Sequence, residues 1–291
     1  MSTGTATLKI DELINNNKEL PSLPAALMQV IQETGKATAS AGAIADLIAR
    51  DQSLSAKLLK LSNSAYYGMP GQVDDLVESV MILGMKNVRN MALAAGTHTW
   101  MNKPLKGYLL EPKQMWNHSF GVAIGSRIIA AESKKLNPDI AFTAGLLHDI
   151  GKVALSAWLE DKIKYIIKIA QSKNLPFDEA ERQVLGFDHT QVGERLGMKW
   201  NLPDNLIQAI RYHHKPNECD PTSSLVDSIH LGNYLTMSMG YGLGGDGLHY
   251  EVFGETFDRL GIQPENIDKI SSQFVSEFEE YDQIFKELGS E

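Results

Sequence analysis

The chain has 291 residues, 43% of them hydrophobic and 22% charged, which is typical of a globular protein with two modest domains. No segment approaches the ~20 apolar residues of a membrane span, and the N-terminus has no basic region followed by an apolar core. We therefore expect a cytoplasmic protein that does not act on membranes. The net charge of −9 opposes general binding to nucleic acid, because such binders concentrate Lys and Arg.

The first third of the chain has apolar residues at helical spacing and no strand-like alternation. Leu54, Leu58 and Leu61 recur at i, i+4 and i+7, which predicts a helix with one buried face. A break at Asn102-Lys103-Pro104 marks a domain boundary. We predict an N-terminal helical domain at 8–106 and a second helical domain at 107–291. Helices are expected over 8–17, 25–31, 40–50, 51–62, 76–83 and 88–97.

The second part of the chain is also helical in pattern. Asp188 is suited to cap the helix that follows it, so we expect His189 in the first turn of that helix. Gly186 and Gly197 are interpreted as stops of the helices that precede them. The glycine-rich range 240–247 lacks a preceding strand and a Lys-Ser/Thr ending, so it is interpreted as a flexible connection and not as a phosphate loop. Further helices are expected over 116–131, 153–170, 177–185, 203–214, 223–239, 252–260 and 267–288.

An adjacent His-Asp pair, His148-Asp149, follows an apolar helical run and precedes Gly151 and Lys152. Neighbours on a helix point about 100° apart, so both can converge on one ion only near a helix end and with ligands from other helices. Seven of the eight histidines lie between residues 118 and 249. A single histidine in an apolar helix is more often a hydrogen-bonded core residue, but this joint pattern favours one metal site. Imidazole with carboxylate suits iron, manganese, zinc or nickel.

Three stretches in the first half of the chain carry a resemblance to a known family. They are Leu20-Pro21-Ser22-Leu23-Pro24, the range 51–65 and the range 79–84. With them the chain resembles the HDOD family, a branch of the HD phosphohydrolase superfamily, over roughly residues 15–240. The resemblance implies an all-α fold in which a helical N-terminal bundle packs on an HD-like helical domain. HDOD proteins are typically bacterial and are thought to act in regulation.

The related HD-GYP phosphodiesterases build a metal site from His, His-Asp, His, His-His and a final Asp. The matching positions imply a metal set in this chain of His118, His148, Asp149, His189, His213, His214 and Asn233. Asn233 stands where the final Asp is expected, and Gln114 replaces a Glu found in three-metal members. The Gly-Tyr-Pro loop is absent, so specificity for cyclic di-GMP is not implied. Iron is the expected ion, with one or two ions bound and two preferred, while manganese, zinc and nickel stay open.

Two functions follow from these residues. The preferred one is a regulatory HDOD protein of bacterial signal transduction with signalling proteins as partners, whose metal site gives little or no turnover. The alternative is a metal-dependent phosphohydrolase or phosphodiesterase acting on a nucleotide or cyclic nucleotide, in which Asp149 bridges two ions and Lys152 contacts substrate phosphate. A nucleic-acid adaptor is disfavoured by the acidic balance. We expect Asn233 to be weakly bound or held off the metal, with His230 or Asp227 compensating.

Overall fold

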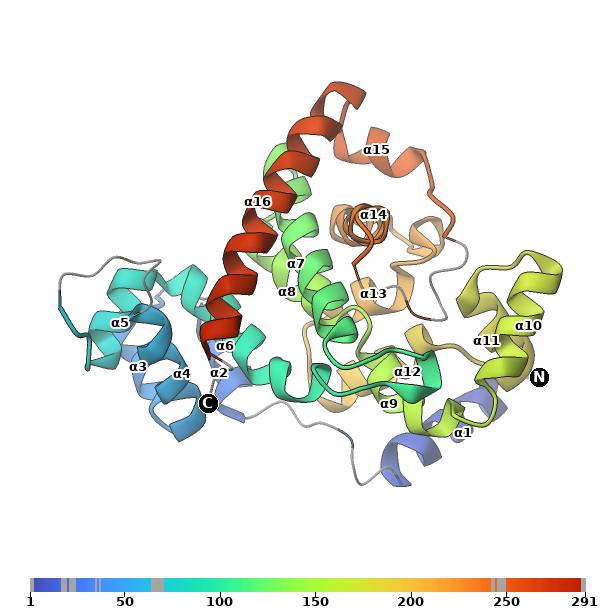
Figure 1. Cartoon of the computed structure of the whole chain (residues 1–291), viewed down its shortest axis with the longest axis horizontal. Helices are drawn as coiled ribbons and strands as arrows, with labels where there is room; N and C mark the ends of the chain where they lie inside the picture. The colour runs from blue at the N-terminus through green and yellow to red at the C-terminus, as the bar shows by residue number, and fades with distance from the viewer. Residues whose placement is uncertain are drawn as a thin grey trace. The chain divides into compact units, whose positions relative to one another are not determined.

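A computed structural model describes residues 3–16, 20, 25–34, 36, 38–63, 71–241, 244 and 250–288. Within these ranges every regular element is a helix, and the remaining β-type pairing is an isolated bridge between Leu105 and Leu110 (Figure 1). The predicted all-α class is confirmed. Several expectations fall outside the described residues, including most of the glycine-rich range 240–247.

The chain contacts form two compact units. The larger unit comprises Met1–Pro21 and Trp100–Phe274, and the smaller comprises Ser22–Thr99 and Val275–Glu291. The predicted domains, 8–106 and 107–291, follow the chain in order, whereas the contacts group the first 21 residues with the later part of the chain. One reason is an ion pair in which the guanidinium of Arg195 donates to both carboxylate oxygens of Asp11, each at 2.8 Å.

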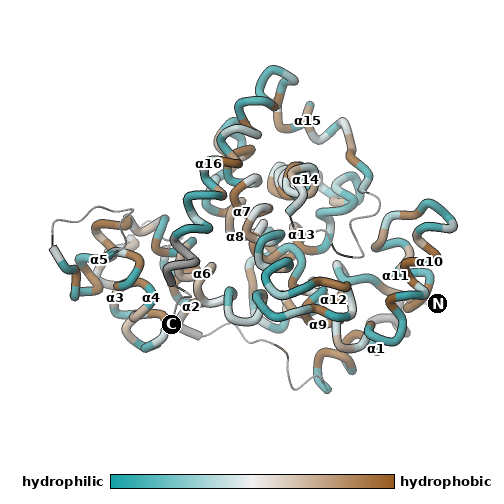
Figure 2. Tube along the Cα trace, in the orientation of Figure 1, coloured by the Kyte–Doolittle hydropathy of each residue, from teal (hydrophilic) through white to brown (hydrophobic). Residues whose placement is uncertain are grey.

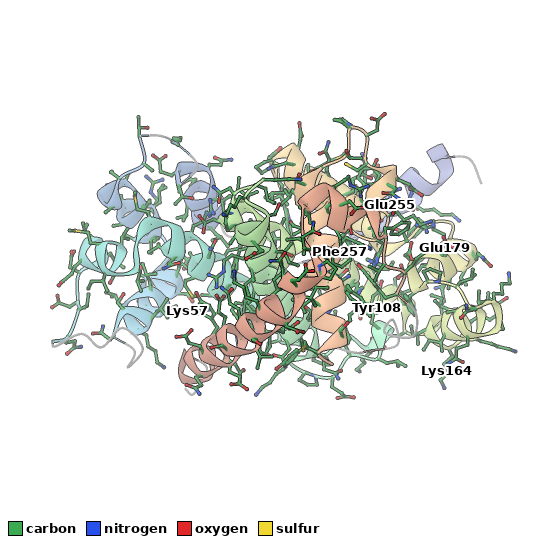
Figure 3. The ribbon with its side chains drawn as sticks, turned by 90° about the horizontal axis from the view of Figure 1, so that it is seen from above. Lys57, Tyr108, Lys164, Glu179, Glu255 and Phe257 are labelled. Carbon is green, nitrogen blue, oxygen red and sulfur yellow. The ribbon has the colours of Figure 1, made fainter. Side chains whose placement is uncertain are left out.

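The smaller unit is built from short amphipathic helices whose starts are fixed by side-chain caps. Ser40, Asp51 and Asp75 each accept a hydrogen bond from the backbone N–H three residues later. Lys57 donates to the carbonyl oxygen of Ala95 (2.9 Å), and its side chain can be followed in Figure 3. These helices are α2 (Ala25–Thr34), α3 (Ala41–Ile48), α4 (Gln52–Ser62), α5 (Leu76–Leu83) and α6 (Met85–Met101), which ends in the larger unit.

The larger unit is arranged around α7, which is buried on most of its faces and packs against α8 and α14. The helices α9 and α12 pack together, and α12 also packs against α13. Along the outer helices, apolar and polar residues recur at helical spacing, which gives each helix an apolar face and a polar face (Figure 2). The elements are α1 (Thr3–Asn16), η2 (Lys106–Tyr108), α7 (Gln114–Ser133), α8 (Pro138–Leu147), α9 (Ile150–Leu159), α10 (Ile163–Lys173), α11 (Phe177–Leu185), α12 (His189–Lys199), α13 (Asp204–Tyr212), η3 (Pro216–Glu218), α14 (Ser224–Ser238), α15 (Glu255–Leu260) and the first part of α16 (Pro264–Leu288).

Helix ends were harder to predict than helices. The range 153–170 divides into α9 and α10, because the charged residues 160–162 form an exposed turn between them. The helix expected over 252–260 begins only at Glu255. Gly197 does not stop α12, which continues to Lys199, and a Cβ at this glycine would lie 3.3 Å from Ile207. Gly186, by contrast, ends α11 with φ of 87° as expected.

One stretch, Pro138–Leu159, is long and apolar enough by composition to cross a membrane. In the structure it is two helices, α8 and α9, separated by a turn at His148 and Asp149. Of its most apolar window, 83% is buried inside the protein. Packing in the helical core therefore accounts for its composition.

The predicted buried face of α4 is confirmed, since Leu54, Leu58 and Leu61 are all buried. We expect Leu58→Ala to lower the free energy of unfolding by about 2–5 kcal/mol, through lost transfer energy and the cavity left behind. Urea denaturation measures this change. Met81 on α5 is 71% exposed, so Met81→Ala is the matched control and should change stability by less than about 0.5 kcal/mol. Equal effects of the two substitutions would contradict the assignment of this face to the core.

Candidate metal centre

The His148-Asp149 pair lies where α8 ends and α9 begins, as expected from the sequence. Helix α8 ends at Leu147, and Asp149 occupies the cap position of α9 without using its side chain to cap it. The carboxylate is thereby left to face inward. Both residues are buried, with 0% of His148 and 1% of Asp149 exposed.

Four further imidazoles converge on Asp149 from other helices. His118 lies in α7, His189 is the first residue of α12, and the pair His213-His214 directly follows α13. The Nε2 atoms of His118 and His148 lie 3.4 and 3.2 Å from Asp149 Oδ2. The Nε2 atoms of His189 and His213 lie 3.4 and 3.5 Å from Asp149 Oδ1. The predicted histidines are thus brought together, with one carboxylate oxygen facing each pair.

The rings of His148 and His213 are each oriented through the other nitrogen. Nδ1 of His148 donates to the carbonyl oxygen of Gly145 (2.7 Å), and Nδ1 of His213 donates to that of Ile210 (2.9 Å). Because a carbonyl oxygen can only accept, Nδ1 carries the proton and Nε2 offers its lone pair to the centre. This is the arrangement of metal-ligating histidines, whose second nitrogen is held by a carbonyl or carboxylate.

The donor atoms form two groups that share Asp149. One group is His118, His148 and Asp149, and the other is Asp149, His189, His213 and His214, with the ligand atoms of each group within 4.8 Å of one another. Among the described residues, the buried Nε2 atoms of His148 and His213 have no hydrogen-bond partner, and Asp149 is paired through Oδ2 with Lys152 Nζ at 2.6 Å. Buried ligand atoms of these types could hold a transition-metal ion.

The charges of the centre follow from its burial. Burial lowers the pKa of His148 to about 4 and that of His214 well below its usual value, so both rings are neutral at pH 7. Burial acts to raise the pKa of Asp149, but the Lys152 ammonium group beside it opposes this, and the pKa lies well below the usual range. Burial also acts to lower the pKa of His189, but Glu181 raises it to about 9. A metal at His189 must therefore displace a proton.

Asn233 is buried on α14 and lines the pocket beside the centre, and its Oδ1 has no hydrogen-bond partner among the described residues. We expected Asp227 or His230, on the same helix, to compensate for the weak ligand Asn233, but both side chains bond to other groups. The guanidinium of Arg259 donates to both carboxylate oxygens of Asp227, at 2.8 and 2.6 Å. His230 donates from Nδ1 to the carbonyl oxygen of His213 (2.8 Å), and its Nε2 accepts from the backbone N–H of Phe253 (3.2 Å).

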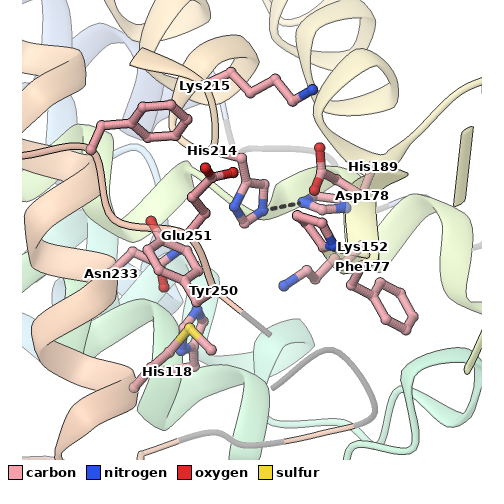
Figure 4. Close-up of a pocket in the computed structure, with 13 residues that line it drawn as sticks. His118, Lys152, Phe177, Asp178, His189, His214, Lys215, Asn233, Tyr250 and Glu251 are labelled. Carbon is pink, nitrogen blue, oxygen red and sulfur yellow. Dashed lines mark hydrogen bonds between the residues drawn. The ribbon is translucent and has the colours of Figure 1, made fainter. Parts of the chain in front are cut away.

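A pocket opens beside the centre and holds residues that the sequence did not point to. Figure 4 shows His189 and His214 meeting at its inner end, where their Nε2 atoms are 3.0 Å apart. Two lysines and several aromatic rings line it, so it presents cations and flat apolar surfaces together. Its lining is His118, Lys152, Pro176, Phe177, Asp178, His189, His214, Lys215, Asn233, Met237, Tyr250, Glu251 and Phe253.

Glu181 is the most informative residue that was missed. It is fully buried on α11 and accepts a hydrogen bond from Nδ1 of His189 at 2.6 Å. A signal was present in the sequence, because Glu181 falls on the apolar face that Phe177, Ala180 and Leu185 form at helical spacing. A carboxylate on such a face needs a buried partner.

Gly151 allows the two helix starts that carry Asp149 and His189 to touch. A Cβ at this position would overlap the carbonyl oxygen of His189 and lie 2.7 Å from the backbone nitrogen of Gly193. The backbones of α9 and α12 are therefore in direct contact next to the centre. Glycine is needed at residue 151 for this close approach.

The sequence matches the family model of the HDOD domain over residues 20–216. The chain belongs to the HDOD family. A curated relative of this HDOD chain, an uncharacterized protein from Treponema pallidum (strain Nichols), is 27% identical over 225 residues. These residues are 74% of this chain and 42% of the relative, so the HDOD chain spans less than half of that protein.

Solved structures share the fold. An HDOD domain protein of unknown function from Geobacter sulfurreducens has a TM-score of 0.73 at 22% identity, with 97% of each chain covered. A candidate signal transduction protein from Marinobacter aquaeolei VT8 has a TM-score of 0.72 at 25% identity, with 92% of this chain and 59% of that chain covered. A candidate phosphohydrolase from Shewanella amazonensis SB2B has a TM-score of 0.61 at 21% identity, with 92% and 97% covered.

We expect Gly151→Ala to destabilise the protein by about 1–3 kcal/mol, because the new methyl group forces α9 and α12 apart. Chemical denaturation followed by circular dichroism measures the loss. Gly42 lies in α3 with nothing within 4 Å of an added Cβ, so Gly42→Ala is the control and should be neutral or stabilising by up to about 1 kcal/mol. If the Gly151→Ala protein is as stable as the wild type, the close approach of the two helices is not required.

Proposed function

We propose that this chain is a regulatory HDOD protein of bacterial signal transduction, whose HD-type centre binds metal ions with little or no turnover. The observation that carries the proposal is the set of donors around Asp149. Five imidazoles supply ring nitrogens, but Asp149 is the one carboxylate in the two ligand groups of the described residues. Asn233 stands beside them as an uncharged amide.

This set of ligand atoms supports the binding of metal ions more than the hydrolysis of a phosphate ester. Two divalent ions bring four positive charges, and the two groups of donors offset one of them through Asp149. Neutral imidazoles hold such ions well, but a nearby aspartate would add the second negative charge that the Asn233 amide lacks. When bound, the ions would supply Lewis acidity toward a phosphate ester. We propose iron as the ion, two per chain, because a mixed imidazole and carboxylate set suits it.

The family relationship supports the same proposal. The Marinobacter structure, which is 25% identical and shares the fold, is that of a candidate signal transduction protein. We propose that the partners of this chain are likewise signalling proteins. Because the Treponema relative is more than twice as long as the matched part, such a partner can also be a further domain of the same polypeptide.

A second function is favoured by the two lysines of the pocket. Lys152 Nζ lies 2.6 Å from Asp149, and Lys215 Nζ lies 2.7 Å from Glu179 while its side chain lines the pocket. Two ammonium groups in the lining of one pocket suit a phosphorylated ligand. In a metal-dependent phosphohydrolase, Asp149 would hold both ions and Lys152 would contact the phosphate of a nucleotide or cyclic nucleotide.

Metal content tests both functions, and turnover separates them. We expect protein purified without chelators and without a histidine tag to contain close to two transition-metal ions per chain, measured by elemental analysis. Assays against cyclic dinucleotides, nucleotides and generic phosphodiesters should show no turnover. Asp149→Ala should remove most of the metal, because both ligand groups lose their shared carboxylate. Turnover that Asp149→Ala abolishes would favour the phosphohydrolase, and metal-free wild-type protein would contradict both functions.

Restoring the carboxylate tests the role of Asn233. We expect Asn233→Asp to bind metal about tenfold or more tightly, because the added charge offsets that of the ions. Competition with a coloured chelator measures the affinity. Ser238→Asp, at an exposed position on the same helix, is the control for added charge alone. Equal affinities of the wild type and Asn233→Asp would show that residue 233 does not face the ions.

A further inference from the structure

The buried carboxylate of Glu181 is held by three polar contacts although it belongs to neither ligand group. Its Oε1 accepts from the hydroxyl of Tyr108 at 2.6 Å. Its Oε2 accepts from Nδ1 of His189 at 2.6 Å and from the backbone N–H of His189 at 3.0 Å. Since Glu181 is fully buried, its charge is tolerated only because these donors replace water. Two of the three contacts are with His189, so Glu181 serves to hold that residue in place.

This contact distinguishes His189 from the other ligands. Nδ1 of His148 and of His213 donates to a backbone carbonyl, whereas Nδ1 of His189 donates to a carboxylate. A carboxylate partner makes an imidazole a stronger donor to a metal and fixes its plane more firmly. The second contact, to the backbone N–H of His189, also fixes the start of α12. His189 belongs to one of the two ligand groups, so that group contains a histidine whose ring is held by a carboxylate.

Tyr108, which lies in η2, has its ring close to both His189 and Lys152. Its side chain is fully buried, and its ring meets that of His189 edge to face, with centroids 6.4 Å apart. The ammonium group of Lys152, which pairs with Asp149, lies 5.8 Å from the centre of the same ring. Tyr108 is therefore placed to orient Glu181 through its hydroxyl and to limit the movement of His189 through its ring.

The short helix η2, which carries Tyr108, packs closely against α9. The backbone N–H of Gly107 donates to the hydroxyl of Ser156 at 3.1 Å. A Cβ at Gly107 would overlap the backbone carbonyl oxygen of Ser156 and lie 2.9 Å from Leu159. No side chain fits between η2 and α9, so the position of Tyr108 depends on this glycine.

We propose that Glu181 and Tyr108 are positioning residues that set the metal affinity of one half of the centre, the half formed by Asp149, His189, His213 and His214. Glu181 holds the donor atom of His189 in place, and Tyr108 acts through Glu181. The other half, formed by His118, His148 and Asp149, does not depend on them. The inference rests on the proposed function, because it requires that the centre binds metal.

Cobalt(II) titration of the metal-depleted full chain tests this, followed by calorimetry and by the visible absorption of the bound ion. The wild type should bind two ions. Glu181→Gln keeps the shape but removes the charge, and should weaken one ion about 10- to 100-fold while the other is unchanged. Tyr108→Phe should weaken the same ion less, about threefold to tenfold. The double variant should bind that ion no more weakly than Glu181→Gln alone, because the tyrosine acts through the glutamate.

Matched controls separate positioning from general destabilisation. Glu160→Gln and Tyr165→Phe change exposed residues of the same types and should leave both ions unaffected. His118→Ala should weaken the other ion and so identify the two halves by their absorption bands. Gly107→Ala should reproduce the Tyr108→Phe binding defect without changing any donor group. Circular dichroism shows whether each variant is folded, and Tyr108→Phe provides the test if Glu181→Gln is not.

The outcomes are distinct. Two ions in the wild type, with both weakened equally in Glu181→Gln or neither weakened, would overturn the positioning role and leave the proposed metal site standing. A double variant that binds much more weakly than Glu181→Gln alone would show that Tyr108 does not act through the glutamate. No cobalt binding by the wild type would overturn the proposed function, and the positioning role with it.

Discussion

Keeping one buried carboxylate charged is the constraint on which the larger unit depends. Asp149 is 1% exposed, and removing a carboxylate from water costs several kcal/mol unless nearby charges and donors replace the lost hydration. Lys152 supplies a positive charge at 2.6 Å, and the four imidazole nitrogens that approach within 3.5 Å are ligand atoms for a cation that would supply more. Each of these groups is buried as well, so the arrangement is stable only as a set.

Helix ends provide the geometry that this set requires. A side chain in the middle of a helix shares its direction with residues three and four positions away, whereas an end residue can turn toward a centre that the helix itself does not line. His148, His189 and His213 all lie at such ends. His118 is the exception, and it lies within α7, which is buried on most of its faces. Most of these histidines therefore reach the centre from helix ends, and His118 reaches it from within a long helix.

The sequence predicted the helices and drew attention to the His148-Asp149 pair at a helix end, because both are local patterns. Leu54, Leu58 and Leu61 identify a buried face by their spacing alone, and Asp188 identifies a helix start by its position before His189. The support of the ligands was not predictable in the same way. Tyr108 and Glu181 are 73 residues apart, and nothing in either segment specifies the other. Asn233 lines the pocket beside the centre, and the engagement of Asp227 by Arg259 depends on a segment 32 residues later.

The return of α1 to the larger unit affects the order in which the chain can fold. Asp11 and Arg195 are 184 residues apart in sequence, with all of residues 22–99 between them. Contacts of such separation form late, because a long loop must close before they stabilise anything. On a ribosome, α1 emerges long before α9 and α12, the helices that it contacts in its own unit. The smaller unit is likewise incomplete until α16 has been made, so neither unit can finish folding before the last helix is synthesised.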